Sequence, residues 1–436
     1  MQGYFYELIE ALLEAIPAGC EGEAWFEGDE LDDLRFRGST LHDGRARFAR
    51  SIRVRLLRGG RAARGEASLG GQLKVDRATV RNLVVELEGT LEHAVDDPHF
   101  GVVASGESDE WRGANELPTV EEVIDAVAAR SPGGDWSGRY LGGQRCRGYA
   151  DTRGQRNWYS SYLFDLVGVT LLDAHRGLPD RYSGEVWDAE RAVTPWARRE
   201  ATRAVIAESP RSIAAGAVRV AFAPEAVRRL VDEFARGCSE HALRTGTSSL
   251  QRIYRDPLVD RAIRWVERGR GLAPHFDRRG RLKIDETLLV DGGRGCGSLV
   301  SARSSSVFGA TANGADDDER PVALAMQPGV IDDPITTLDR GIWVGSLHDA
   351  TVRADRRGRF AGVTSVGAFW VEEGELRAPI PPTRIGGTIE AALGEAFLGA
   401  TRESRTLIVT EPEAIGGVRR YDVPGILVAE LDVEPA

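Results

Sequence analysis

Metal chemistry is the first activity to consider for this chain, because it contains seven histidines and four cysteines. A zinc hydrolase needs two histidines about one helical turn apart, with a glutamate beside them to activate the metal-bound water. No two histidines of this sequence have that spacing, so it has no His-Glu-…-His motif. The histidines are His42, His93, His99, His175, His241, His275 and His348.

The segment Cys238-Ser239-Glu240-His241 places a thiol and an imidazole three residues apart, which could bind one metal ion. His275 or Cys296 could in principle complete such a site. A four-coordinate site needs more ligands than this segment supplies. We therefore interpret Cys238 and His241 as structural residues.

The sequence also lacks a clear motif for nucleophilic catalysis or for phosphate binding. The hydroxyl-rich runs at 245–249 and 304–306 are not Gly-x-Ser-x-Gly elbows, and such runs are typical of turns and helix caps. The glycines at 292–297 do not open a helix, so they match a phosphate cradle poorly. Lys74 and Lys283 are the only lysines, and neither lies in a phosphate-loop or Schiff-base motif.

Composition narrows the class of protein. A net charge of −11 argues against nucleic acid as the main partner. The longest apolar run, Leu166 to Leu172, is far too short to span a membrane. The four cysteines are widely spaced, which fits reduced thiols better than a disulfide framework. We expect a cytoplasmic protein.

One segment departs from the acidic average, because residues 35–64 contain ten arginines. Polar and apolar residues alternate in Arg53-Val54-Arg55-Leu56, which is typical of a strand pair with one solvated face. We interpret the run as an exposed sheet face. The alternative is a surface for an acidic partner.

The 436 residues suggest two or three domains. Apolar spacing predicts helices at 1–16, 76–94 and 119–130, with strands between 23 and 75. A glycine- and arginine-rich stretch at 131–156 favours a boundary, and the pattern changes again near 216. We expect an N-terminal α+β domain at 1–130, a middle region at 131–215 and a β-rich domain at 216–436.

A predicted hairpin lies in the last of these regions, at Gly362 to Ile389. Residues alternate up to Trp370, Glu373-Gly374 supplies the turn, and a prolyl pair at 381–382 ends the second arm. The sequence of this hairpin resembles the C-terminal region of the TldD/PmbA family, the so-called modulators of DNA gyrase. Further similar segments are Ala273 to Gly280, Leu289 to Gly293, Thr311 to Gly314 and Ile342 to Leu347.

The resemblance implies where a zinc motif would lie. That family pairs a zinc peptidase subunit with a sister subunit that has lost its zinc motif. The matching helix here, after the strand at 218–222, carries Asp232-Glu233-Phe234-Ala235-Arg236-Gly237. Glu233 is retained, while Asp232 and Gly237 occupy the two histidine positions. The family's C-terminal cysteine ligand is also absent, with Glu413 and Ala414 in its vicinity.

The chain thus resembles the PmbA (TldE) type, with no catalytic residue and no metal of its own. The resemblance implies an α+β fold, with an N-terminal α/β-type sandwich region and a curved, barrel-like C-terminal β-sheet with few helices. It also implies a zinc-containing TldD-type partner and a chamber for peptide substrates. Candidates to line the chamber are Thr247, Ser248, Ser249, Gly367, Phe369 and Trp370.

We consider two functions from different classes of protein, a subunit of an enzyme complex and a binding or scaffold protein. The first is a non-catalytic subunit of a TldD-type metallopeptidase complex that degrades or processes unfolded or precursor peptides. The alternative is a stand-alone homodimeric scaffold or peptide-binding protein without a proteolytic role.

Overall fold

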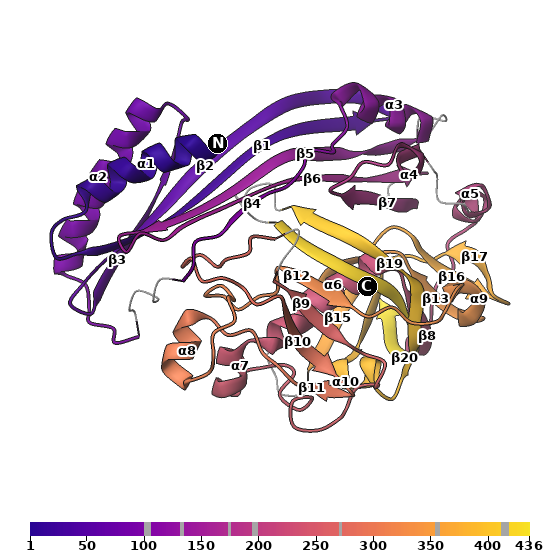
Figure 1. The fold of residues 1–436 in the computed structure, drawn as a ribbon. Coiled ribbons are helices and arrows are strands. Elements are labelled where there is room, and N and C mark those ends of the chain that lie inside the picture. The colour runs from indigo at the N-terminus through magenta and orange to yellow at the C-terminus, as the bar shows by residue number, and fades with distance from the viewer. Residues whose placement is uncertain are drawn as a thin grey trace.

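A computed structural model describes residues 1–99, 106–130, 135–172, 176–193, 199–269, 273–353, 358–410 and 418–436. Two sheets organise these residues, and the first runs along the top of Figure 1 above the second. The fold is therefore mixed α+β, as predicted. Among the described residues, no helix is long and apolar enough to cross a membrane.

The first sheet has seven strands in the order β3-β2-β1-β5-β6-β4, with β7 paired to β6. Its strands take residues from both predicted regions, 1–130 and 131–215. They are β1 (Glu21–Arg37), β2 (Thr40–Arg58), β3 (Arg61–Ser68), β4 (Glu110–Arg112), β5 (Trp136–Asp151), β6 (Arg156–Leu171) and β7 (Gly177–Gly184). The helices of this half are α1 (Gln2–Ala15), α2 (Leu73–Glu92), α3 (Val120–Arg130), α4 (Ala189–Val193) and α5 (Arg199–Ala207).

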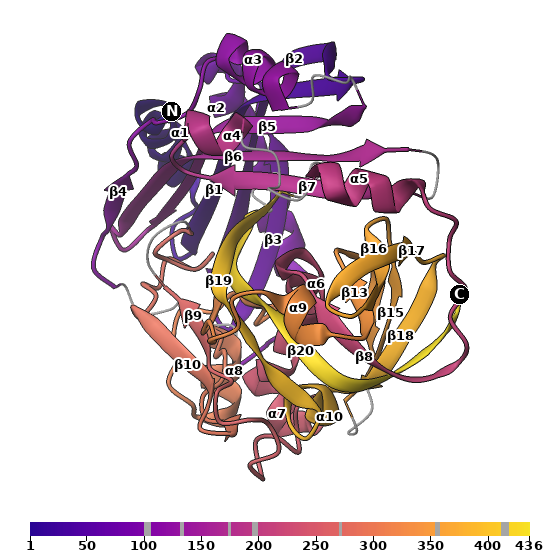
Figure 2. The ribbon, with the colours of Figure 1, turned by 90° about the vertical axis from the view of Figure 1, so that its right-hand side faces the viewer.

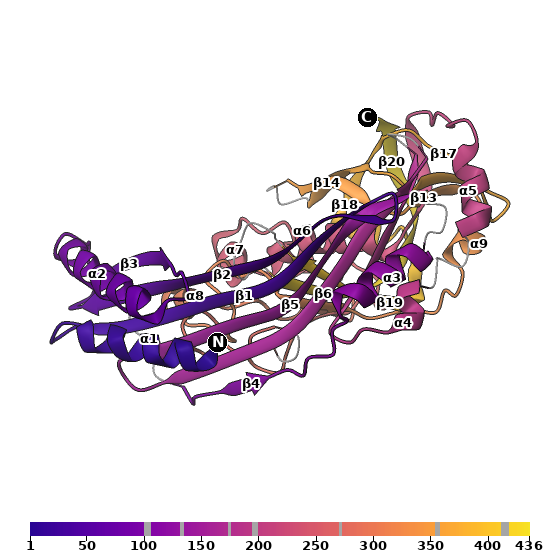
Figure 3. The same ribbon diagram turned by 90° about the horizontal axis from the view of Figure 1, so that it is seen from above.

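The two faces of this sheet differ because side chains alternate along a strand. On β1, Ala24 and Phe26 are buried in a core with Phe5 and Leu12 of α1 and Val84 of α2. Figure 3 shows α1 and α2 lying along one end of the long strands. The intervening residues of β1 and β5 point to the opposite face, which is polar. The second half of the chain covers part of that polar face.

The second sheet has thirteen strands and is built around β20 (Val418–Pro435), which pairs with β8, β12, β18 and β19. Figure 2 shows how strongly β19 and β20 curve. The other strands are β8 (Gly216–Phe222), β9 (Trp265–Arg268), β10 (Glu286–Asp291), β11 (Arg294–Gly295), β12 (Ala323–Met326), β13 (Gly341–Val344), β14 (Leu347–Val352), β15 (Arg359–Thr364), β16 (Ala368–Glu372), β17 (Glu375–Pro379), β18 (Thr383–Thr388) and β19 (Phe397–Thr410).

Few helices accompany this sheet, as predicted. They are α6 (Pro224–Ala235) with the 3-10 turn Arg236–Cys238, α7 (Glu240–Thr245), α8 (Ala302–Phe308), α9 (Pro334–Leu338) and α10 (Ile389–Leu393). Helices α6 and α10 both contribute residues to the main core, and α6 contributes more of them. Its Val227, Leu230 and Phe234 meet Phe222 of β8 and Val428 of β20 there.

A tight turn at Gly280, in the part of the chain that forms the second sheet, packs against the first sheet. The carbonyl of Gly280 accepts hydrogen bonds from the side-chain amides of Gln155 (2.5 Å), just before β6, and Asn157 (3.0 Å) on β6. Nearby, the ring of Phe276 meets Trp25 of β1 edge to face, with centroids 5.6 Å apart. The residues around this turn, 273–283, therefore dock on the polar face of the first sheet.

A buried ion pair makes a second junction. Arg181 of β7 contacts Asp165 of β6 at 2.7 Å and Glu225, at the start of α6, at 3.2 Å. Burial alone would raise the pKa of Glu225, but the guanidinium groups of Arg181 and Arg228 lower it overall. The first turn of α6 is thereby fixed against the first sheet.

The predicted hairpin is confirmed as β16 and β17, which pair antiparallel across Glu373 and Gly374. Both turn residues have positive φ, 55° and 68°. Thr388 caps α10, which ends at Leu393. The interpretation of residues 35–64 as an exposed face holds for Arg35, Arg37, Arg45, Arg61 and Arg64, but not for the whole segment. Arg55 is only 9% exposed and pairs with Glu23 at 2.6 Å.

Candidate functional site

The helix on which the resemblance places the zinc motif is α6. Pro224 occupies its first turn, where the missing N–H has no partner to lose. Its apolar side chains face the core, so the opposite side of the last turn is left for Asp232 and Glu233. The helix then tightens into a 3-10 turn that contains Gly237. The sequence prediction of a strand followed by this helix is confirmed.

The carboxylate of Asp232 accepts hydrogen bonds from three side chains. Tyr421 Oη donates to Asp232 Oδ1 at 2.6 Å, and both Arg320 Nη2 (3.3 Å) and Arg419 Nη1 (3.4 Å) donate to the same oxygen. Burial alone would raise the pKa of Asp232, but the phenol and the nearby guanidinium groups lower it overall. The carboxylate is thus charged and satisfied by protein donors.

Glu233 and Gly237 have different surroundings. Glu233 is partly exposed, and its carboxylate pairs with Arg236 of the next turn at 3.1 Å. Gly237 is buried, and a Cβ added there would lie 2.6 Å from Leu250 Cγ and 2.9 Å from Ser249 Oγ. A histidine at position 237 would therefore collide with the segment that follows α7.

These residues do not fit a zinc ion. Zinc binds deprotonated thiols, imidazoles and carboxylates, and here the single carboxylate at the first motif position faces two cations and a phenol. In the part of the chain that the structure describes, no group of three His, Cys, Asp or Glu residues could hold a metal ion. Glu413 and Ala414 lie outside the described residues.

The Cys238–His241 segment has a structural role here. Cys238 is fully buried, and burial raises the pKa of its thiol to about 12. The backbone N–H of His241 instead donates to Glu319 at 2.8 Å, and Ser239 Oγ donates to the same carboxylate at 2.6 Å. Ser239 also caps α7. The segment is a helix start fixed by Glu319.

The six chamber candidates lie at turns and in cores. Ser248 is buried and donates to the Gly237 carbonyl at 2.6 Å, which ties it to the end of α6. Phe369 is in a buried cluster, and the guanidinium of Arg211 lies 4.4 Å from the ring of Trp370. The remaining three are Thr247, Ser249 and Gly367. None of the six lines the cavity described next.

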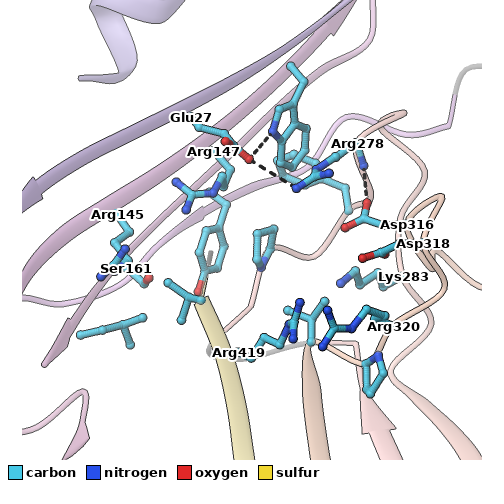
Figure 4. Close-up of a pocket in the computed structure, with 18 of the residues that line it drawn as sticks. Glu27, Arg145, Arg147, Ser161, Arg278, Lys283, Asp316, Asp318, Arg320 and Arg419 are labelled. Carbon is cyan, nitrogen blue, oxygen red and sulfur yellow. Dashed lines mark hydrogen bonds and ion pairs between the residues drawn. The ribbon is translucent and has the colours of Figure 1, made fainter. Parts of the chain in front are cut away.

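A cavity of about 170 Å³ lies between the polar face of the first sheet and the second half of the chain. Figure 4 shows its charged residues, with Arg145 and Arg147 projecting from the first sheet and Arg320 and Arg419 from the opposite side. Seven cations and three carboxylates line it. The cations are Arg53, Arg145, Arg147, Arg278, Lys283, Arg320 and Arg419, and the carboxylates are Glu27, Asp316 and Asp318.

The cavity lies between Asp232 and the first sheet, because Arg320 and Arg419 line it and also donate hydrogen bonds to Asp232. On the sheet side, Arg145 and Arg147 share one buried acid, Asp29, at 3.1 and 3.3 Å. Burial, with repulsion from neighbouring arginines, lowers the pKa of Arg145 to about 10. The cavity is therefore positively charged on both sides.

Sequence reasoning missed these cations, although one signal was available. Arg145 and Arg147 flank Cys146 in a strand, so both must point to the face opposite the cysteine. In the antiparallel register they lie opposite Asp29 and Glu27 of β1. The sequence alone thus shows that the two arginines share a face, whereas the acids opposite them and the covering of that face are seen only in the fold.

A wider space of about 540 Å³ adjoins this cavity and shares Trp25, Arg53 and Arg278 with it. Its other walls come from β1 to β3 and the turn at Arg279. The two spaces form one cleft along the inner face of the first sheet. Glu27 lies where they meet, accepting from Trp25 Nε1 at 2.9 Å.

The comparisons with known proteins agree with this fold. Three crystal structures are similar over nearly the whole chain: a Thermotoga maritima modulator of a DNA gyrase (16% identity, TM-score 0.77, 99% of this chain and 100% of that one), TldE from Thermococcus kodakarensis (15%, 0.75, 99% and 99%) and a Bacteroides thetaiotaomicron modulator of DNA gyrase (12%, 0.73, 100% and 99%). At these identities the likeness shows the fold alone. No curated protein matches the sequence.

The family comparison carries the assignment. The model of the PmbA/TldA metallopeptidase C-terminal domain matches residues 215–434. That range contains the second sheet, helix α6 and the hairpin by which the sequence resembled this family. The chain belongs to the TldD/PmbA family of metallopeptidase-like proteins.

Proposed function

We propose that this chain is the non-catalytic, TldE-like subunit of a peptidase complex whose zinc ion belongs to a TldD-type partner. The observation that carries the proposal is the environment of Asp232. Two guanidinium groups and a phenol surround the carboxylate at the position where a zinc peptidase would need a metal ligand. A divalent cation beside Arg320 and Arg419 would be repelled by both.

Gly237 supports the same proposal independently. The second ligand position lacks a side chain, and its backbone is packed against Leu250 and Ser249 too closely to admit one. In this proposal, the loss of zinc ligands therefore involves the packing around the end of α6 as well as the exchange of single residues. The similarity in fold to TldE from Thermococcus kodakarensis is consistent with this role.

In such a complex, this chain would bind and orient peptides while the partner activates water. The charged cleft along the first sheet offers one binding surface. Exposed strand edges are another, because an extended peptide pairs with them through its backbone and little sequence is read. The peptides would be unfolded or precursor chains in the cytoplasm.

Co-expression with a TldD-type chain that carries an intact zinc motif tests the proposal. The expected result is a stable complex with peptidase activity, which is lost when the metal-site glutamate of the partner is changed and kept when Glu233 of this chain becomes glutamine. A homodimer that never exchanges with the partner would support the alternative, a stand-alone scaffold or peptide-binding protein.

A further inference from the structure

The charge of the cavity is opposite to that of the whole chain. The protein carries a net charge of −11, yet the cavity has seven cations against three carboxylates. Like charges in a site of low dielectric repel one another, which destabilises the empty site. Binding of a ligand of opposite charge offsets this repulsion. The cavity is thus suited to an anion.

Lys283 is the most informative of these cations. It is one of two lysines in the chain and is only 9% exposed. Within the described residues, no hydrogen bond or ion pair reaches its ammonium group. The nearby buried carboxylate of Glu267 instead accepts the N–H groups of Val322 (2.8 Å) and Ala323 (3.1 Å). Lys283 lines the cavity and interacts with the carboxylates of Glu267 and Asp277 through charge rather than a hydrogen bond, so its N–H donors are left for a ligand there.

Two arginines have the same incomplete pairing. Arg145 is 4% exposed, its Nε has no hydrogen-bond partner among the described residues, and the carboxylate that it contacts, Asp29, is shared with Arg147. The Nε of Arg320 is also buried without a partner, although the other end of its guanidinium reaches Asp232. Unsatisfied donors therefore come from both sides of the same cavity.

The shape of the cleft selects the kind of anion. The inner cavity has room for a small charged group, and the adjoining space of about 540 Å³ can hold a longer chain attached to it. Trp25 borders both spaces and Phe276 the inner one, so the cleft also offers an apolar surface. Arginine forks match the planar oxygens of a carboxylate, and lysine adds a point charge.

We propose that this cavity binds a carboxylate of an extended peptide through Lys283, Arg145 and Arg320. The peptide chain then lies in the wider part of the cleft along β1 and β2. This inference rests on the proposed function, since it names the substrate class, acidic peptides, that the subunit would select. The carboxylate can be a C-terminus or the side chain of Asp or Glu.

The test measures binding of fluorescent hexapeptides to the purified full chain, without a partner. Four peptides separate the two sources: a free C-terminal acid, its amide, an internal glutamate with an amide end, and the glutamine equivalent. The inference predicts that at least one carboxylate peptide binds more tightly than its neutral match, and that the preference falls as salt is raised. Binding of all four with equal affinity, or of none, would overturn it.

Two matched variants assign the binding to the cavity. Lys283→Met keeps the length of the side chain and removes the charge, and it should weaken the carboxylate peptide by about tenfold or more. Lys74→Met, at the only other lysine, should leave binding unchanged. Neutral-peptide affinity and thermal unfolding of Lys283→Met report any structural damage separately. If inorganic phosphate bound the wild-type chain and the carboxylate peptides did not, the site would be a phosphate site and the inference wrong.

Failure here is distinguishable from failure of the proposed function. Assembly with a TldD-type partner is measured by co-purification. The peptidase activity of the complex depends on the partner's zinc and is measured separately. A chain that assembles with the partner but shows no carboxylate preference would overturn the substrate class alone. A chain that prefers carboxylates but never assembles would overturn the subunit role alone.

Discussion

The phenol of Tyr421 donates a 2.6 Å hydrogen bond to Asp232, which joins β20 to the last turn of helix α6. Arg320 and Arg419 complete the environment of this carboxylate. The position is therefore a structural ion-pair network. Its charges hold α6, β20 and the segment before β12 together.

Replacing Asp232 by asparagine should destabilise the protein. The change leaves two partly buried guanidinium groups without their shared charge, and breaking such a network costs about 2–4 kcal/mol. Urea unfolding followed by tryptophan fluorescence measures the loss. Tyr421→Phe removes only one hydrogen bond and should cost about 1 kcal/mol. An Asp232→Asn variant as stable as the wild type would contradict the network.

The turn at Gly280 should be intolerant of a side chain. Its φ is +74°, and a Cβ there would lie 2.2 Å from Tyr149 Cε1. Gly309 is a matched control, since its φ is +72° and no atom lies within 4 Å of an added Cβ. Alanine at Gly309 should cost about 1 kcal/mol from the backbone alone. Alanine at Gly280 should cost at least about 2 kcal/mol more, because it also disrupts the docking of the two halves.

Equal thermal shifts for the two alanine variants would show that the turn is not tightly packed against Tyr149. Limited proteolysis adds a second readout. The Gly280 variant should be cut more readily between the halves, whereas the Gly309 variant should resemble the wild type.

Asp277 predicts a specific pH dependence of stability. It is 2% exposed, and burial together with the charge of Asp316 raises its pKa from 3.8 to about 7. Between about pH 4 and 7 the folded chain keeps a proton that the unfolded chain has lost. This group therefore lowers the free energy of unfolding as the pH rises through that window, by an amount on the order of a few kcal/mol.

Asp277→Asn removes this loss while keeping the oxygen that accepts the Arg279 and Arg281 N–H groups at 2.8 and 3.0 Å. Relative to the wild type, the variant should gain stability between pH 4 and pH 7 and show no further relative change above pH 8. Urea titrations at several pH values measure the difference. A constant difference across the window would contradict the raised pKa.

Local patterns in the sequence predicted most of the elements. The helix at 120–130 begins as expected, because Thr119 and Glu122 form reciprocal capping hydrogen bonds at 3.2 and 2.7 Å. The hairpin turn at Glu373-Gly374 was equally local. Such features depend on residues within a few positions of one another, so their physical cause is visible in the sequence.

The candidate site could not be predicted in the same way. Arg145 pairs with Asp29 across 116 positions, and Asp232 pairs with Arg320 and Arg419 across 88 and 187 positions. Alternation along a strand reveals two faces, but it does not show which part of the chain covers the polar one. The family resemblance directed attention to Asp232, whereas the cations around it could be identified only from the fold.

The zinc content of the purified chain, expressed alone without chelator and measured by inductively coupled plasma mass spectrometry, tests the central claim most directly. The environment of Asp232 predicts far less than one zinc per chain, with no change in Asp232→Asn or Glu233→Gln. One zinc per chain that is lost in either variant would contradict a non-catalytic subunit and place a metal centre on α6.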